Sequence, residues 1–198
     1  GGRSMKKFDS IQGKIQPDPP ISENRLRECK WEPSVEFKIP DDWLSGVYLG
    51  KLTAKKVGET NGAIHFQFEL GADWTVPGTV ITPVKARGTS LLVADQGRKA
   101  QTARVKALLD SGQRVVAIDP FIFGESKIKR RDFLHVLLVH AVGERALGIQ
   151  SSQIASIANW AKKEFGGPVQ LTSVGPRLSV AARIAAVQTD AISGVELH

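Results

Sequence analysis

Four short apolar runs, separated by segments with helical periodicity, constrain the fold of this chain more than any other feature of its sequence. The runs are residues 90–97 (SLLVADQG), 114–120 (RVVAIDP), 169–175 (VQLTSVG) and 191–197 (AISGVEL). Each run is apolar on both faces, which is typical of strands buried between two layers of helices. The sequence therefore predicts an α/β fold, a mainly parallel sheet flanked by helices on both faces.

The segments between these runs are predicted to be helices. They comprise residues 98–112, 130–142, 151–167 and 176–188. In the third of them Ser151 or Ser152 is the expected N-cap, because a serine hydroxyl can accept a hydrogen bond from a backbone N–H of the first helical turn.

The residues before the first apolar run read differently. Residues 64–70 and 75–83 are predicted strands, the second interrupted by Pro77 and Gly78. Within residues 31–54 the period-two alternation of strands is shown by Val35, Phe37 and Ile39, and again by Val47, Leu49 and, after a one-residue shift, Leu52. The polar segment 55–62 (KKVGETNG) is expected to be a boundary. We therefore expect a β-rich, sandwich-like segment at 1–57 and an α/β domain at 63–198.

Composition argues against several classes of function. The formal net charge is +7, but the densest basic run, residues 127–131, lacks interleaved aromatic residues, so we expect no nucleic-acid partner. No apolar run approaches the roughly 20 residues that span a bilayer, and the first residues lack the apolar core of a secretory signal. The single cysteine, Cys29, cannot form a disulfide within the chain, so it does not indicate whether the protein belongs to an oxidising or a reducing compartment.

No metal or cofactor is expected. His135 and His140 are five residues apart, so on a helix they point in different directions and cannot share a metal ion. His65 alternates with Phe66 and Phe68 and is expected on the exposed face of a strand.

Ligands of parallel sheets bind beyond the carboxyl ends of the strands, and three loops of this chain follow predicted strands there. They contain Asp95, Gln96 and Gly97; Asp119, Gly124 and Ser126; and Gly175, Arg177 and Ser179. In a purely structural role Gly124 allows a positive φ and Ser126 caps a helix. Arg177 could grip an anion, or it could form a salt bridge with Asp119 or Glu125.

The third loop is similar to the G-x-S-x-G nucleophile elbow of α/β-hydrolases, in which a strand leads through a tight turn into a helix. The frame is Gly175-Pro176-Arg177-Leu178-Ser179, so an arginine stands where the serine is expected. A guanidinium stays protonated and has no lone pair to attack a carbonyl. Ser173 and Ser179 are nearby hydroxyls, but neither is expected at the exposed apex of the turn.

Residues from about 63 to 198 resemble the acetyl xylan esterase-like branch of the α/β-hydrolases. The resemblance is carried by VVAIDPFIFGES (115–126), by residues 143–169 and by SVGPRLS (173–179). It implies that Arg177 takes the nucleophile position, Ser179 the second glycine, and Asp95-Gln96-Gly97 the oxyanion-side loop. The triad acid and histidine would follow later strands, and His198 comes too early to be that histidine.

Residues 1–55 bear a second resemblance, to the N,N-dimethylformamidase large-subunit-like family. It is carried by GGRSM, by QPDPP (16–20) and by RECKWEPSVEFKIPDDWLSGVYLGKLTA (27–54). It implies a β-sandwich segment that precedes a catalytic region with a metal site. Two family fragments are thus expected to join near residues 55–62, and the chain is interpreted as a fragment or an assembled sequence.

These observations favour a degenerate carbohydrate-esterase-like domain with little or no ester hydrolysis. The alternative is a non-catalytic binding module that holds an anionic ligand near Arg177, and the third reading is an amide hydrolase related to N,N-dimethylformamidase. A saccharide ester or another small anionic ligand is the expected partner. Self-association through the exposed edge of the last strand, residues 191–197, is also expected.

Overall fold

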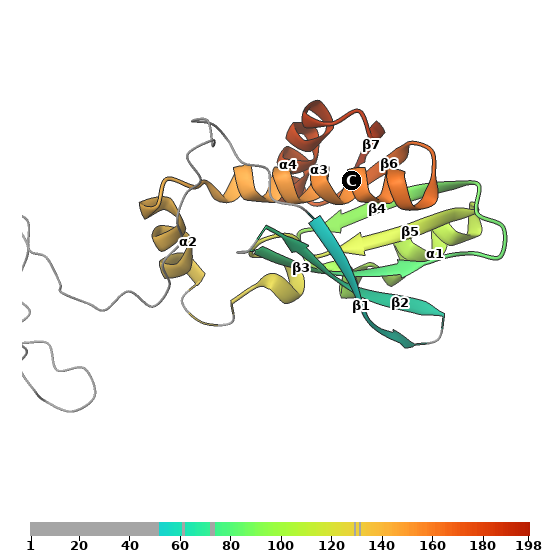
Figure 1. The fold of residues 1–198 in the computed structure, drawn as a ribbon, viewed down its shortest axis with the longest axis horizontal. Helices are drawn as coiled ribbons and strands as arrows, with labels where there is room; N and C mark the ends of the chain where they lie inside the picture. Colours follow the sequence, from blue (N-terminus) through green and yellow to red (C-terminus); the bar gives the residue numbers. More distant parts are fainter. Residues whose placement is uncertain (1–51, 61, 72–73, 129, 131) are drawn as a thin grey trace, which may run out of the picture. The chain divides into compact units, whose positions relative to one another are not determined.

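The structure, a computed structural model, describes residues 52–60, 62–71, 74–128, 130 and 132–198 (Figure 1). In this part of the chain seven strands form one mixed sheet, in the order β1-β2-β3-β5-β4-β6-β7. The strands are β1 (Leu52–Thr60), β2 (Ala63–Leu70), β3 (Trp74–Ile81), β4 (Gly88–Ala94), β5 (Gln113–Ile118), β6 (Val169–Val174) and β7 (Ile192–Leu197).

The four predicted apolar strands are β4, β5, β6 and β7, and they run parallel to one another. Strand β4 pairs with β5 on one side and with β6 on the other, and β6 pairs with β7. The remaining three strands are antiparallel, and β3 joins them to β5. The α/β fold class predicted from the sequence is confirmed.

Helices cover both faces of the sheet, as Figure 1 shows. On one face α3 (Ala146–Phe165) and α4 (Pro176–Gln188) pack against the larger core, which includes Phe68, Leu91 and Ile118. On the other face α1 (Thr102–Asp110) places Val105 and Leu108 against a smaller core of Leu92, Val115 and Ala117. Alternate side chains of β4 and β5 enter the two cores, which is why Leu91 to Ala94 and Val115 to Ile118 form continuous apolar runs.

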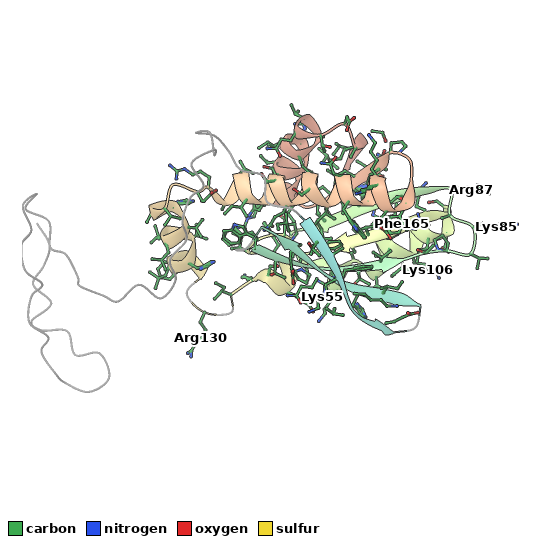
Figure 2. All side chains as sticks on the ribbon, viewed as in Figure 1. Lys55, Lys85, Arg87, Lys106, Arg130 and Phe165 are labelled. Carbon is green, nitrogen blue, oxygen red and sulfur yellow. The ribbon has the colours of Figure 1, made fainter. Side chains whose placement is uncertain are left out.

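Three further elements lie at the carboxyl edge of the sheet. They are the 3-10 turns η2 (Arg98–Gln101) and η3 (Gly124–Ser126) and the helix α2 (Asp132–Ala141). Among the described residues no helix is sufficiently long and apolar to cross a membrane. The labelled basic side chains Lys55, Lys106 and Arg130 lie on β1, on α1 and before α2 (Figure 2).

The start of α3 differs from the prediction. The helix begins at Ala146, and its N-cap Arg145 makes no side-chain capping hydrogen bond. Ser151 is buried within the helix, where its hydroxyl donates to the carbonyl of Gly148 at 3.0 Å. In the sequence, a serine whose hydroxyl bonds to a carbonyl of its own helix resembles an N-cap, although no helix begins or ends at it.

The expected boundary at 55–62 is largely a strand. Residues 52–60 form β1, which pairs with β2 and carries an irregularity between Lys56 and Gly58. In the described sheet β1 is at the edge and Lys55, Lys56 and Val57 are all exposed, which explains why the segment is polar. Residues 1–51, including the predicted strands around Val35 and Phe37, lie outside the described residues, and the division into 1–57 and 63–198 stays a prediction.

Candidate functional site

The three loops predicted from the sequence meet beyond the carboxyl ends of β4, β5 and β6. Asp95 of the first loop bonds to the backbone of the third loop. Gly97 of the first loop lies against Gly124 of the second, so closely that a Cβ on Gly97 would stand 2.5 Å from the Cα of Gly124. The packing therefore excludes side chains at the point of contact.

The third loop has the strand–turn–helix form of the predicted elbow. Strand β6 ends at Val174, Gly175 has φ 101° and ψ 154°, and α4 begins at Pro176. Arg177 lies in the first turn of the helix and does not have a positive φ; among the described non-glycine residues that conformation belongs to Ile122, at 61°. The positive φ of this turn is therefore at Gly175, and the residue at the nucleophile position, Arg177, has no positive φ.

The carboxylate of Asp95 occupies the N-terminus of α4. Its Oδ2 accepts a hydrogen bond from the backbone N–H of Arg177 at 3.0 Å, and its Oδ1 accepts one from that of Leu178 at 2.8 Å. Gly175 permits this approach, since a Cβ there would lie 2.6 Å from the Asp95 carboxyl carbon. A negative charge at a helix N-terminus is favourable, so Asp95 acts as a cap supplied from 82 residues away.

This contact matters chemically. In a hydrolase elbow the N–H of the residue after the nucleophile donates to the oxyanion. Here that residue is Leu178, and its N–H donates to a fixed carboxylate. The group that would stabilise negative charge in the transition state is already bonded to negative charge.

The Arg177 guanidinium lies over the ring of Phe123, with 4.7 Å from Cζ to the ring centroid. The predicted salt bridge from Arg177 to Asp119 or Glu125 is not formed. Both carboxylates bond instead to Arg98, which follows β4 and was not singled out from the sequence. Proximity in sequence to a strand end was the only signal that could have identified Arg98.

Asp119 is the centre of a polar cluster that links the first two loops. It is 1% exposed and accepts hydrogen bonds from the backbone N–H groups of Arg98, at 2.7 Å, and Glu125, at 3.0 Å, besides the ion pair with the Arg98 side chain. Ser126 donates its hydroxyl to the Asp119 carbonyl at 2.7 Å and thereby closes the loop. The helix cap expected at Ser126 from the sequence is not formed. The cluster is a fully bonded structural unit.

Glu125 completes this cluster at its exposed side. Its carboxylate binds Lys99 at 2.5 Å and also binds Arg98. The hydrogen bond from Lys99, with the hydrogen bond from Arg98 and the charges of both, lowers the pKa of Glu125 from its usual value of 4.5, although partial burial opposes the change.

Neither candidate serine has the environment of a nucleophile. Ser173 is buried in β6, with 0% exposure. Ser179 donates its hydroxyl to the carbonyl of Gly175 at 2.6 Å, one helical turn back. A general base would have to displace this backbone bond before it could activate Ser179.

The histidines are not gathered at one site: His198 bonds through its backbone to Gly175 of the third loop, whereas His135 and His65 lie on other elements. His135 packs on the ring of Phe121 at 5.6 Å, and among the described residues no three His, Cys, Asp or Glu side chains are grouped to hold a metal ion. His65 lies in β2, and its Nδ1 is 3.1 Å from the hydroxyl of Thr79 on β3.

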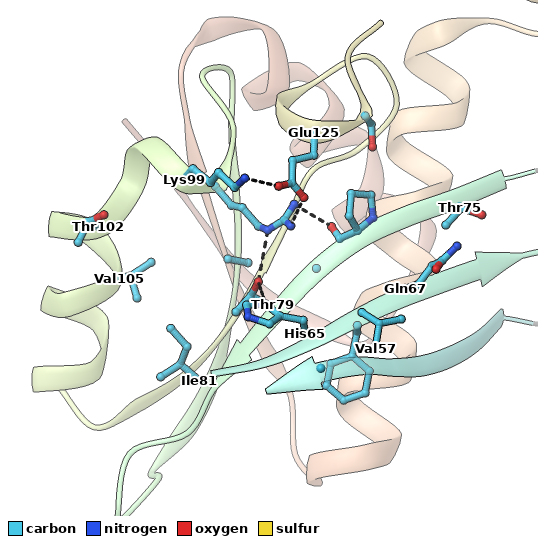
Figure 3. Close-up of a pocket in the computed structure, with 17 residues that line it drawn as sticks. Val57, His65, Gln67, Thr75, Thr79, Ile81, Lys99, Thr102, Val105 and Glu125 are labelled. Carbon is cyan, nitrogen blue, oxygen red and sulfur yellow. Dashed lines mark hydrogen bonds and ion pairs between the residues drawn. The ribbon is translucent and has the colours of Figure 1, made fainter. Parts of the chain in front are cut away.

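A groove that the sequence did not indicate lies on the face of the sheet covered by α1. It has a volume of about 910 Å³ and runs between α1 and strands β1, β2 and β3 (Figure 3). His65, Thr79, Arg98 and Val105 are among the residues that line it. In the sequence, only the alternation of polar and aromatic residues in β2 pointed to this face of the sheet. It placed His65 on the face opposite to that of Phe66 and Phe68.

Comparison with known proteins agrees with both resemblances. Residues 1–95 match the family described as N,N-dimethylformamidase beta subunit-like, C-terminal. The likeness predicted for residues 1–55 is confirmed, and the match continues through the segment 55–62 and as far as β4. No curated protein sequence matches the chain significantly.

Solved structures share the fold of the described part. A protein from Bacteroides fragilis assigned as an acetyl xylan esterase matches with a TM-score of 0.56 and 16% identity, over 73% of this chain and 47% of its own. A thermostable carboxyl esterase from Bacillus coagulans matches with a TM-score of 0.51 and 15% identity, over 70% of this chain and 44% of its own. The chain thus spans less than half the length of either esterase and shares with them an α/β fold.

Proposed function

We propose that this chain contains a non-catalytic α/β-hydrolase-like domain, in which the elbow is retained as a structural turn. The observation that carries the proposal is the contact between Asp95 and the backbone N–H groups of Arg177 and Leu178. It places a carboxylate where a hydrolase stabilises an oxyanion, beside an arginine at the nucleophile position. Loss of the nucleophile and of the oxyanion donor together removes both main contributions to acyl transfer.

The test is acetate release from an activated aryl acetate by the wild-type chain, by Arg177→Ser and by the double variant Arg177→Ser/Asp95→Ala. We expect no turnover by the wild type and at most weak turnover by Arg177→Ser, because Leu178 still donates to Asp95. Arg183→Ser, which alters an exposed arginine later in α4, is the matched control. Efficient turnover by the wild type, with a serine-directed reagent attached to Ser173 or Ser179, would refute the proposal.

A second candidate function is the binding of a small anion, such as the carboxylate of an acidic sugar, at Arg177. The observation in its favour is that the exposed Arg177 guanidinium forms no ion pair within the described residues and is held only by Phe123. The nearby Asp95 carboxylate opposes it. Titration with benzoate, compared between the wild type and Arg177→Gln, tests this candidate: binding that the substitution abolishes supports it, and equal behaviour of the two proteins excludes it.

A further inference from the structure

We propose that the groove between α1 and strands β1–β3 binds an uncharged amide or ester, whose carbonyl accepts a hydrogen bond from His65 and whose apolar body lies against Ile81 and Val105. The inference rests on the proposed function in one respect, that the ligand is held and not hydrolysed. The volume of about 910 Å³ lies within the range of roughly 300–1,000 Å³ that is usual for ligand sites. The hollow between the first and second loops, beside Gln96 and Asp119, has only about 230 Å³.

The groove has a mixed lining because strands β2 and β3 present different residues to the two faces of the sheet. Phe66 and Phe68 of β2 turn to the α3 face, where their rings lie 5.4 and 4.8 Å from that of Trp160. The alternate residues His65 and Gln67 line the groove. Figure 3 shows both residues on β2, with α1 flanking one side of the groove.

Polar and apolar groups alternate around this space. Hydrogen-bonding groups come from the strands and from the start of α1, and include Thr75, Thr79 and Thr102. Apolar side chains stand beside them on the same elements, with Ile81 next to Thr79 on β3 and Val105 one turn after Thr102 on α1. A ligand that fits both must combine an apolar body with a small number of hydrogen-bonding atoms.

The charges at one end of the groove indicate that this ligand is neutral. Arg98 and Lys99 line that end, and both bond to Glu125. Arg98 also bonds to the buried Asp119, so two cations and two anions satisfy one another. A charged ligand would lose its hydration in the groove without finding an unpaired opposite charge, or it would have to break one of these ion pairs. Both events cost free energy.

The hydrogen bonds around Thr79 are compatible with a free donor on His65, in the tautomer that the proposal requires. Arg98 Nε donates to the Thr79 hydroxyl oxygen at 3.3 Å, and the same oxygen is 3.1 Å from His65 Nδ1. The hydroxyl hydrogen of Thr79 can then be donated to Nδ1, which leaves the imidazole hydrogen on Nε2. Nε2 has no hydrogen-bond partner among the described residues, so its N–H is available to an acceptor such as a carbonyl oxygen.

The experiment uses three probes of one shape that differ in charge: neutral benzamide, anionic benzoate and cationic benzamidine. Each is titrated into the ¹⁵N-labelled full chain and followed by amide chemical shifts. We expect benzamide to bind saturably with a Kd on the order of a millimolar, as befits so small a ligand. Its largest shifts should fall on β2, β3 and α1, and the two charged probes should bind at least about tenfold more weakly.

Two substitutions fill the groove from exposed positions, Thr102→Trp on α1 and Val57→Trp on β1. Each should abolish benzamide binding, and the isosteric Thr79→Val should weaken it several-fold because His65 loses the partner that fixes its tautomer. The matched control is Val187→Trp, at a position that is 89% exposed on α4. It should bind benzamide as the wild type does, and the amide spectrum of each variant reports whether it is folded.

Failure of benzamide to bind saturably overturns the proposal, and so does a preference for benzoate or benzamidine. Binding that survives both tryptophan substitutions also overturns it, because the ligand then lies elsewhere. These outcomes are independent of the proposed lack of catalysis, which the aryl acetate assay measures separately. A chain that hydrolysed aryl acetates but bound benzamide in the groove would refute only the first proposal.

Discussion

At the scale of single residues, Asp95 connects two strands that are adjacent in the sheet and distant in sequence. Because its carboxylate bonds two N–H groups of the first turn of α4, Asp95→Ala should lower the free energy of unfolding by about 1–2 kcal/mol, the usual cost of losing a helix cap. Urea unfolding followed by circular dichroism measures this change.

The control for this prediction is Asp190→Ala. Asp190 is 90% exposed and pairs with Lys162 at 3.3 Å, so its removal should change the free energy of unfolding by less than about 0.5 kcal/mol. Equal effects of the two substitutions would show that Asp95 contributes only as a surface charge and does not hold α4.

Gly97 is a second residue whose role comes from a close approach. Its φ is 82°, and a Cβ would collide with the backbone of Gly124 at 2.5 Å. Gly97→Ala should therefore destabilise the chain by more than the roughly 1–2 kcal/mol that a left-handed conformation costs by itself. Gly143→Ala separates the two effects, because Gly143 has φ 91° and open space around it. If both variants unfold at the same urea concentration, the loops do not pack as tightly as described.

The same residues show where prediction of the site from sequence stops. The positions of Asp95, Asp119 and Gly175 after strands were predictable, because the apolar strands before them are unambiguous. Their partners were not predictable. The bonds from Asp95 to α4, and the choice of Arg98 in place of Arg177 as the partner of Asp119, depend on how loops separated by 20 to 80 residues come together, and no periodicity encodes that.

At the scale of elements, the buried strands were predictable and the exposed ones were less so. Strands β4 to β7 were found because each contains buried apolar residues between helical segments, and in β4 and β5 burial on both faces makes these residues consecutive. The part of β1 from residue 55 onwards was not recognised as a strand, because several of its residues are charged and it contains Gly58. The start of α3 was missed because its first turn, at Ala146, carries no capping side chain.

The link between η2 and η3 gives a prediction of pH dependence. The pKa of Glu125 is lowered in the folded chain, mainly by its hydrogen bond from Lys99. Its stabilising contribution is therefore fully present above the usual pKa of 4.5 and is lost as the pH falls through the lower folded value. Glu125→Gln should be less stable than the wild type at pH 7, and the difference should shrink at pH 3.

Urea unfolding at pH 7, 5 and 3 gives this comparison directly. Glu164→Gln, which alters an exposed glutamate near the end of α3, is the control and should show no such convergence. A difference between Glu125→Gln and the wild type that stays constant from pH 7 to pH 3 would mean that the ion pairs with Lys99 and Arg98 contribute nothing to folding.

At the scale of the whole molecule, the described sheet is unprotected along β7. This strand pairs with β6, and no strand of the described part lies on its other side. An open edge offers unpaired backbone groups to another chain, so self-association through β7 remains our expectation. Ser193→Lys places a charge at an exposed position of this edge and should shift light scattering at high protein concentration towards the monomer. Unchanged scattering would locate any association elsewhere.

Helix α2 is the other surface through which copies of the chain could associate. Leu137 and Leu138 are 57% and 67% exposed, and Val142 just beyond the helix is 79% exposed. Contiguous apolar side chains of this kind promote association, whereas their replacement by charged residues costs little stability because they bury little surface on folding. The double variant Leu137→Glu/Leu138→Glu should therefore unfold within about 1 kcal/mol of the wild type and scatter less light at high concentration. A large loss of stability would instead show that α2 is covered within the folded chain, and unchanged scattering would leave β7 as the surface that associates.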